Sequence, residues 1–141
     1  MNIKRTSKEM SYRALKIGNG NVHWLSEKTG TDNGFDLVSV EGMKREFIGV
    51  KATEGTDIFN ITANELRVMQ DFCGKEDTYL IHRYRFEEDK VVAFNIYEYD
   101  KEHNALVDVI DDTNICTIAP IKGTAQYACT PLKITKKYEL K

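Results

Sequence analysis

Two short runs of strand-forming residues, separated by a turn that contains a glycine, constrain the fold of this chain more than any other feature. The runs are residues 35–40 (FDLVSV) and 45–52 (REFIGVKA), and Gly42 lies between them. Runs of β-branched and aromatic residues on either side of such a turn are typical of a β-hairpin. We therefore expect a sheet in which these two segments are neighbouring strands.

The strongest helix signal comes after this hairpin, over residues 62–73. Thr62 and Glu65 have the spacing of a capping box, in which each side chain binds a backbone amide of the other residue. Leu66 and Met69 continue at helical spacing, and Gly74 stands at the expected C-terminal stop. The sequence predicts a helix here that packs on the sheet.

A first helix is predicted over residues 7–16, because Met10, Ala14 and Ile17 recur at helical spacing and Gly18 follows them. Further strands are predicted over residues 22–25, 78–86, 91–99, 106–110, 115–118 and 127–134, and residues 58–61 are expected to lead from a loop into the helix over 62–73. No repeat or linker divides the chain. The order of elements predicts an α/β (α+β) fold, one domain over residues 1–141 with a mixed sheet flanked by two helices.

Composition excludes several classes of protein. A chain of 141 residues with 41% hydrophobic residues suits one domain with one buried core. It has no apolar run of roughly 18 residues, so we expect a cytoplasmic protein with no membrane partner. The net charge of −2 argues against a strongly basic, non-specific nucleic-acid binder. Three widely spaced cysteines without a C-x-x-C pair predict reduced, mostly buried thiols.

One strand of the hairpin, residues 45–52, contains a residue type that metal-dependent hydrolysis uses. Hydrolysis of a phosphodiester with Mg²⁺ needs carboxylates that hold the ion and commonly a lysine near the attacking water. Side chains alternate along a strand, so Lys51, Gly49 and Phe47 share one face. An acid that works beside Lys51 therefore belongs at position 49, where this chain has glycine.

Four segments in this order resemble one known family: residues 34–37 (GFDL), 47–53 (FIGVKAT), 59–66 (FNITANEL) and 79–83 (YLIHR). They are similar to the nuclease-like domain at the C-terminus of NO VEIN-type proteins, a relative of the Mrr-like restriction endonucleases in the PD-(D/E)xK superfamily. The resemblance is strongest over residues 22–85. It implies a restriction-endonuclease-like fold and, where a family member is active, a Mg²⁺ cofactor.

Carried onto this chain, the resemblance implies that Asp36 is a metal-binding and catalytic acid and that Lys51 is the lysine of the E-x-K element. The glutamate of that element falls on Gly49, and the backbone carbonyl of Val50 is a further ligand by analogy. A displaced carboxylate can take the place of the missing one. Glu65, which matches an asparagine-glutamate pair of the family, is the leading candidate for this catalytic and metal-binding role, and Glu54 is the second.

Each of these residues also has a structural interpretation, which the sequence leaves open. Asp36 suits a solvated residue after a glycine turn, and Lys51 suits an edge strand that needs a charge. Glu65 suits the capping box alone. Gly49 suits a β-bulge or a close approach of backbone.

Two arginines, Arg83 and Arg85, lie on one face of a predicted strand. They either bind nucleic-acid phosphates or form salt bridges with nearby acids. The three histidines, at positions 23, 82 and 103, do not have the spacing of metal ligands, and we interpret them as structural or surface residues.

Two functional hypotheses follow from these residues and the resemblance. The first is a nucleic-acid-binding or protein-interaction module with a degenerate nuclease site, whose partner is DNA or a protein, in phage defence or counter-defence. The alternative is an active Mg²⁺-dependent DNA endonuclease that uses Glu65, which requires Asp36 and Glu65 to approach each other. On the sequence alone, Gly49→Glu is expected to restore metal binding.

Overall fold

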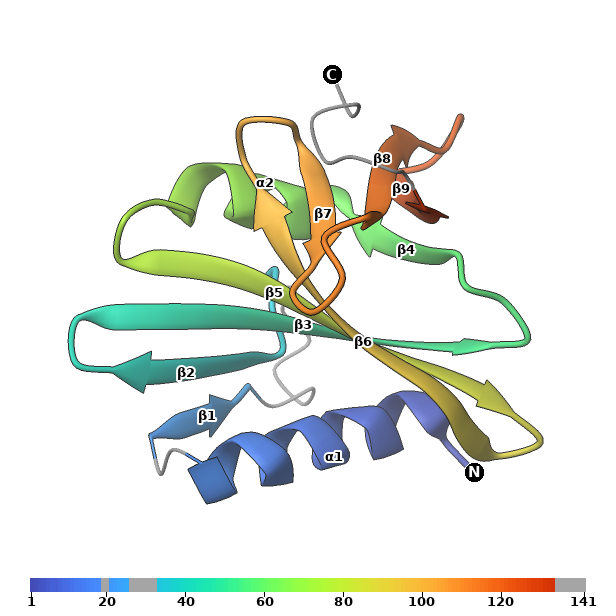
Figure 1. Cartoon of the computed structure of the whole chain (residues 1–141), viewed down its shortest axis with the longest axis horizontal. Helices are drawn as coiled ribbons and strands as arrows, with labels where there is room; N and C mark the ends of the chain where they lie inside the picture. The colour runs from blue at the N-terminus through green and yellow to red at the C-terminus, as the bar shows by residue number, and fades with distance from the viewer. Residues whose placement is uncertain (19–20, 26–32, 134–141) are drawn as a thin grey trace.

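The computed structural model describes residues 1–18, 21–25 and 33–133 (Figure 1). Its elements are α1 (Ile3–Gly18), β1 (Val22–Trp24), β2 (Leu37–Glu41), β3 (Lys44–Glu54), β4 (Phe59–Thr62), α2 (Ala63–Phe72), β5 (Asp77–Glu87), β6 (Lys90–Asp100), β7 (Ala105–Asp108), β8 (Asn114–Pro120) and β9 (Gln126–Lys133). The described strands form one sheet in the order β1-β2-β3-β5-β6-β7-β8-β9-β4. Of the neighbouring pairs in it, β3 and β5 are parallel and the others are antiparallel. The predicted α+β fold with a mixed sheet and two helices is confirmed.

The predicted hairpin is present as β2 and β3, with Leu37 opposite Ile48. Gly42 has a φ of 63° in its turn, a conformation that glycine adopts without a steric penalty. The strand β3 continues two residues beyond its predicted end and pairs with β5, so that Lys51 lies beside Arg83. The sheet therefore places these two cations next to each other.

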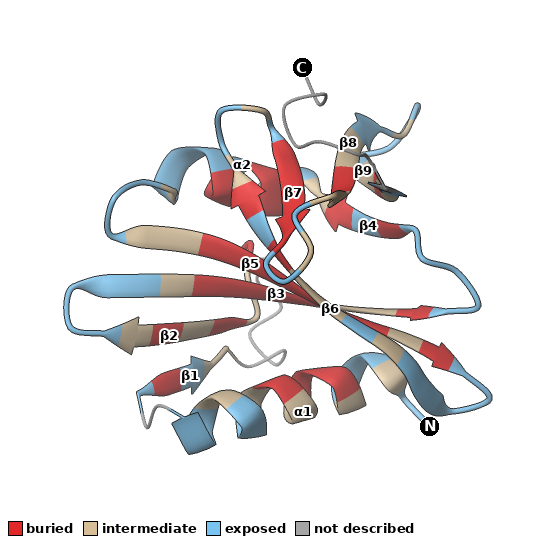
Figure 2. Ribbon diagram, in the orientation of Figure 1, coloured by how far each residue is buried: buried red, intermediate tan, exposed pale blue. Residues whose placement is uncertain are grey.

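Alternate residues of β3 contribute to two different cores. Phe47 belongs to a core that contains Leu66 and Met69 of α2, whereas Ile48 and Val50 belong to a second core against which α1 packs. Because neighbouring residues of a strand point to opposite faces, the two helices cover opposite faces of the sheet. Figure 2 shows the buried residues along the middle of β3 and β5, between the helices.

The second helix, α2, has the predicted capping box: the Thr62 hydroxyl accepts the Glu65 amide at 3.0 Å, and the Glu65 carboxylate accepts the Thr62 amide at 2.8 Å. Its C-terminal end differs from the prediction. The chain leaves the helix at Cys73 in an extended conformation, and the Cys73 amide donates to the Met69 carbonyl at 3.3 Å. The extended backbone at Cys73, rather than a left-handed glycine, ends this helix.

The first helix, α1, begins four residues before its predicted start. Of the three apolar residues that predicted it, Met10 packs against a core, whereas Ala14 and Ile17 are exposed. Ile17 is 89% exposed, while Ser7, Lys8 and Ser11 are buried. The reason lies in the sheet beneath the helix, which presents polar atoms: the Ser11 hydroxyl lies 2.8 Å from His82 Nδ1 and 2.7 Å from the Tyr84 hydroxyl. Burial lowers the pKa of His82 to about 4, so its ring is neutral at pH 7.

The remaining predicted strands are present with shifted ends. The strand predicted over residues 106–110 ends at Asp108, because its carboxylate accepts the amides of Ile110 at 2.9 Å and Asp111 at 3.2 Å and turns the chain. Residue 134, the predicted end of the last strand, lies outside the described residues. Neither helix in the described part of the chain combines the length and the apolar composition needed to cross a membrane.

Candidate functional site

The lysine of the predicted catalytic element forms an ion pair with Glu65. Lys51 Nζ lies 2.7 Å from Glu65 Oε1, the same oxygen that accepts the Thr62 amide. Glu65 is 5% exposed, although it belongs to the first turn of a helix. The capping-box interpretation of Glu65 is therefore confirmed, and the same carboxylate also neutralises Lys51. Its catalytic and metal-binding role stays a prediction.

The space beside Gly49 is already filled. A Cβ added there would lie 2.9 Å from Tyr79 Oη, 3.0 Å from Ile81 Cδ1 and 3.3 Å from Glu65 Oε2. Tyr79 is fully buried, and its hydroxyl donates to the Gly34 carbonyl at 2.6 Å. The register runs through Gly49 without a shift, so close approach rather than a bulge explains this glycine. The packing contradicts the expectation that Gly49→Glu restores a metal site.

Asp36 lies immediately before β2, where three elements meet. Its Oδ2 accepts the Val50 amide at 2.8 Å, and its Oδ1 lies 3.2 Å from Lys8 Nζ of α1. The side chain of Lys8 is 6% exposed, so this is a largely buried ion pair. Asp36 thus links β3 and α1 through its two oxygens and is not simply a solvated residue. Its partner Lys8 was not predicted from the sequence.

The two predicted metal-binding acids do not fit a Mg²⁺ ion as they lie. Mg²⁺ needs close to six oxygen ligands in octahedral geometry at about 2.0–2.1 Å. Of the four carboxylate oxygens, Asp36 Oδ1, Asp36 Oδ2 and Glu65 Oε1 already contact nitrogen atoms, and Glu65 Oε2 faces Gly49. An ion bound by these oxygens would lie beside both lysine ammonium groups, which repel a cation. Each acid is instead neutralised by its own lysine.

A groove of about 430 Å³ opens beside Lys51, between the end of β3 and β4. Its polar lining comes from Lys4, Lys51, Thr53, Glu54, Thr56, Asn60, Thr62 and Gln126. Glu54, the second candidate for the displaced acid, is exposed at the last position of β3. The groove brings the predicted lysine to the surface together with Lys4 from the start of α1.

The two arginines proposed for nucleic-acid binding are engaged in salt bridges. Arg83 and Arg85 both contact Asp57, at 3.1 and 2.9 Å, and Arg85 also contacts Glu87 at 2.9 Å. Arg83 is 4% exposed. The salt-bridge interpretation is confirmed, and a role in phosphate binding stays a prediction.

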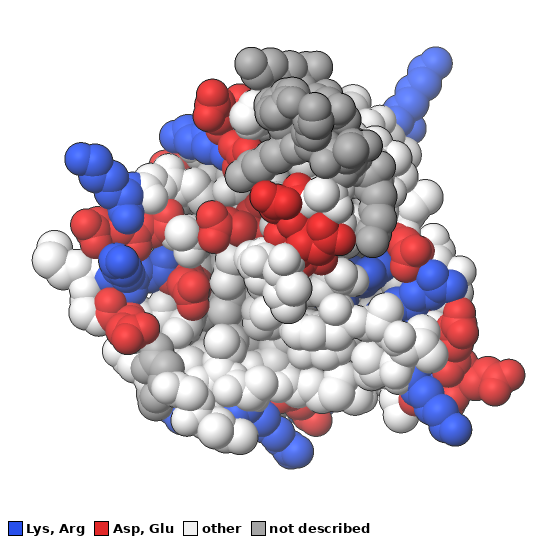
Figure 3. Space-filling view, in the orientation of Figure 1, with Lys and Arg blue, Asp and Glu red and all other residues white. Residues whose placement is uncertain are grey.

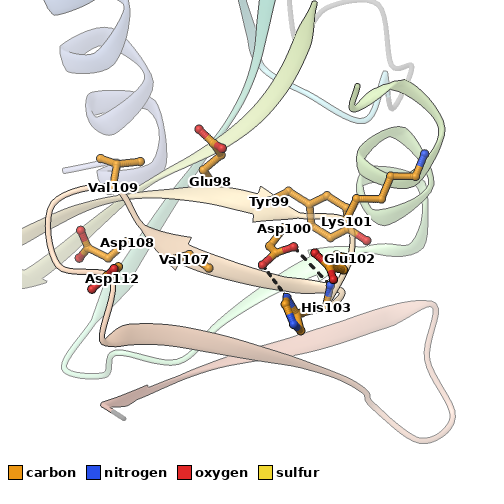
Figure 4. Close-up of a pocket in the computed structure, with 10 residues that line it drawn as sticks. All are labelled: Glu98, Tyr99, Asp100, Lys101, Glu102, His103, Val107, Asp108, Val109 and Asp112. Carbon is orange, nitrogen blue, oxygen red and sulfur yellow. Dashed lines mark hydrogen bonds and ion pairs between the residues drawn. The ribbon is translucent and has the colours of Figure 1, made fainter. Parts of the chain in front are cut away.

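A larger hollow, of about 800 Å³, is lined by the end of β6, the turn that follows it, β7 and the loop after β7 (Figure 4). Among the described residues, Asp100, Glu102 and His103 form the one group of three or more potential metal ligands, with donor atoms within 4.8 Å of one another. Asp100 and His103 point toward each other in Figure 4, and His103 Nδ1 lies 2.9 Å from Asp100 Oδ2. The spacing of the three histidines does not reveal this group, because the neighbours of His103 in it are the carboxylates Asp100 and Glu102.

The cysteines contribute no nucleophile. All three are free, and burial raises the pKa of Cys73 to about 11 and those of Cys116 and Cys129 to about 12. A thiol is reactive as its thiolate, which these pKa values make rare at neutral pH.

The family model described as "Protein NO VEIN, C-terminal" matches residues 5–96, more than half of the chain. The match runs from α1 into β6 and contains the ion pairs of Asp36 and Glu65, whereas β7, β8 and β9 lie beyond it. It is longer than the predicted resemblance because it includes α1 and continues from residue 85 to residue 96. No curated protein matches the chain.

Proposed function

The chain belongs to the NO VEIN C-terminal family, and on this basis we propose that it is a nuclease-fold module that binds nucleic acid without cleaving it. One observation supports the loss of cleavage above all: Lys8 neutralises Asp36, and Lys51 neutralises Glu65. Both contacts occupy carboxylate oxygens that a nuclease of this superfamily would use for metal. The proposal includes the relation of this chain to the Mrr-like enzymes of the PD-(D/E)xK superfamily.

The groove beside Lys51 supports the choice of ligand. Lys51 and Lys4 both line it, and Lys51 lies next to Arg83 in the sheet. An ammonium group has three N–H donors, so Lys51 can bind a phosphate oxygen while it keeps Glu65. On the face that Figure 3 shows, Lys and Arg side chains lie around the rim and acidic side chains gather near the middle. We therefore assign the binding surface to the groove beside Lys51.

An active Mg²⁺-dependent DNA endonuclease is the second candidate function. The observation in its favour is the position of Glu65 Oε2, 3.3 Å from where a Cβ at Gly49 would stand. The carboxylate of Glu65 therefore lies beside the position at which the family carries its glutamate. This function requires Lys8 and Lys51 to withdraw from the two acids.

Binding of a fluorescently labelled DNA duplex, measured by anisotropy over a range of salt concentrations, tests the proposal. We expect affinity that falls as salt rises, because each neutralised phosphate releases counterions and contributes a slope of about −0.9 to log K against log salt. Lys4→Met should make the slope shallower by about 0.9. Lys4 is exposed, so its replacement leaves the fold intact.

Lys44→Met is the matched control, because Lys44 is also exposed but lies at the opposite end of β3 from Lys51. It should leave the slope unchanged. Equal effects of the two substitutions would show that the groove is not the contact surface. Absence of salt-dependent binding would contradict the proposal and leave a protein, in a defence or counter-defence role, as the partner.

A further inference from the structure

Two arginine side chains on β5 converge on a single carboxylate oxygen. Asp57 Oδ1 accepts a hydrogen bond from Arg83 Nη1 at 3.1 Å and another from Arg85 Nη1 at 2.9 Å. The Asp57 backbone carbonyl also accepts from Arg83 Nη1, at 3.2 Å. Asp57 thus faces two positive charges, of which Arg83 is buried and Arg85 is also paired with Glu87.

Both arginines retain donors that no group in the described part of the chain satisfies. Arg83 Nη2 donates to Asn95 and Arg85 Nη2 to Glu87, but the Nε atoms of both arginines are buried without a hydrogen-bond partner. Buried donors without a partner are rare in native proteins. Displacement of Asp57 would in addition free Nη1 of both arginines, which donates to Asp57, for an incoming anion.

Asp57 reaches the arginines from a surface loop between β3 and β4, and its side chain is 52% exposed. Hydrogen bonding to Arg85, aided by the charges of Arg83 and Arg85, holds the pKa of Asp57 below its usual value, so it is an anion at neutral pH. The same loop supplies Thr56 and Ile58 to the groove beside Lys51. An anion that enters the groove therefore meets the loop that carries Asp57.

We propose that Arg83 and Arg85 form a phosphate-binding site, that Asp57 occupies it as an internal anion, and that a phosphate group binds by displacing Asp57. Guanidinium groups bind phosphate through paired hydrogen bonds, and a phosphate offers more acceptor oxygens than one carboxylate. Its source is either free phosphate or a nucleic-acid backbone, and only the second rests on the proposed function. Because Asp57 is tethered beside the arginines, it competes at a high effective concentration.

Asp57→Asn removes this competitor and tests the proposal. We expect the variant to bind inorganic phosphate at least tenfold more tightly than the native chain, measured by the rise of its melting temperature with phosphate concentration. Sodium chloride at matched ionic strength corrects for general salt effects. Titration of both chains with a DNA duplex then separates the two sources: a parallel gain indicates the nucleic-acid backbone, and a gain for phosphate alone indicates the free anion.

Asp77→Asn is the matched control, because Asp77 forms a two-point ion pair with a single exposed arginine, Arg45. This variant should gain no phosphate affinity. If Asp57→Asn is too unstable to study, Asp57→Asn with Arg85→Gln removes one of the facing charges, and Arg85→Gln alone provides its reference. Of these two Arg85→Gln chains, the one that also carries Asp57→Asn should bind phosphate more tightly, through Arg83. Equal phosphate affinity of native, Asp57→Asn and Asp77→Asn chains would overturn the proposal, as would equal affinity of the two Arg85→Gln chains.

Discussion

Lys51→Met is expected to lower the free energy of unfolding by about 3 kcal/mol, the lower end of the range for removing one partner of a buried ion pair. Glu65 is almost fully buried, so its carboxylate would remain in the interior without a cation. We choose the lower end because the Lys51 side chain is 20% exposed and Glu65 keeps the Thr62 amide as a donor. Urea denaturation followed by circular dichroism measures the change.

A second substitution separates the ion pair from simple packing. Glu65→Gln in the Lys51→Met background should recover most of the loss, because glutamine is neutral and still completes the capping box. Arg45→Met serves as the comparison, since the Arg45–Asp77 pair is exposed and its loss should lower the free energy of unfolding much less. A double variant no more stable than Lys51→Met would contradict the role of this ion pair.

Gly49→Glu is expected to be more damaging and to lower the free energy of unfolding by about 4 kcal/mol. Overpacking of a core costs about 1–3 kcal/mol, and a second buried carboxylate beside Glu65 adds an uncompensated charge. The atoms that block the new side chain are Tyr79 Oη, fixed by its bond to Gly34, and Ile81 Cδ1. Thermal and urea denaturation measure this loss.

Gly74→Glu provides the matched control, because no atom lies within 4 Å of a Cβ added at Gly74 and the residue is exposed. That change should stay within about 0.5 kcal/mol. Gly49→Ala should fall between the two variants. A stable Gly49→Glu chain that binds Mg²⁺ would instead show that the site is a nuclease centre that lacks only its glutamate.

The parts of the fold that the sequence predicts are those that local chemistry determines. The capping box of Thr62 and Glu65 depends on residues three positions apart, and the hairpin on a short turn between two strands. The buried face of α1 escaped prediction because periodicity counts apolar residues. This helix packs through Ser11, whose partners His82 and Tyr84 belong to a strand far along the chain.

The candidate site likewise combines features that the sequence predicts with contacts that it does not. The alternation of β3 predicts correctly that Lys51 and Gly49 share a face, and the resemblance directs attention to Glu65. Lys8 and Asp57 could not be found from sequence, because their contacts with Asp36 and with the arginines depend on how α1 and a loop lie against the sheet. No motif marks an ion pair between elements so distant in the chain.

Plasmid cleavage with Mg²⁺ or Mn²⁺ tests the central claim most directly, with the native chain compared with Asp36→Ala and Glu65→Ala. We predict that all three chains leave supercoiled DNA uncut, because Lys8 and Lys51 already neutralise the two acids. Cleavage by the native chain that both substitutions abolish would contradict the account. It would establish a working nuclease in which Glu65 replaces the glutamate that Gly49 lacks.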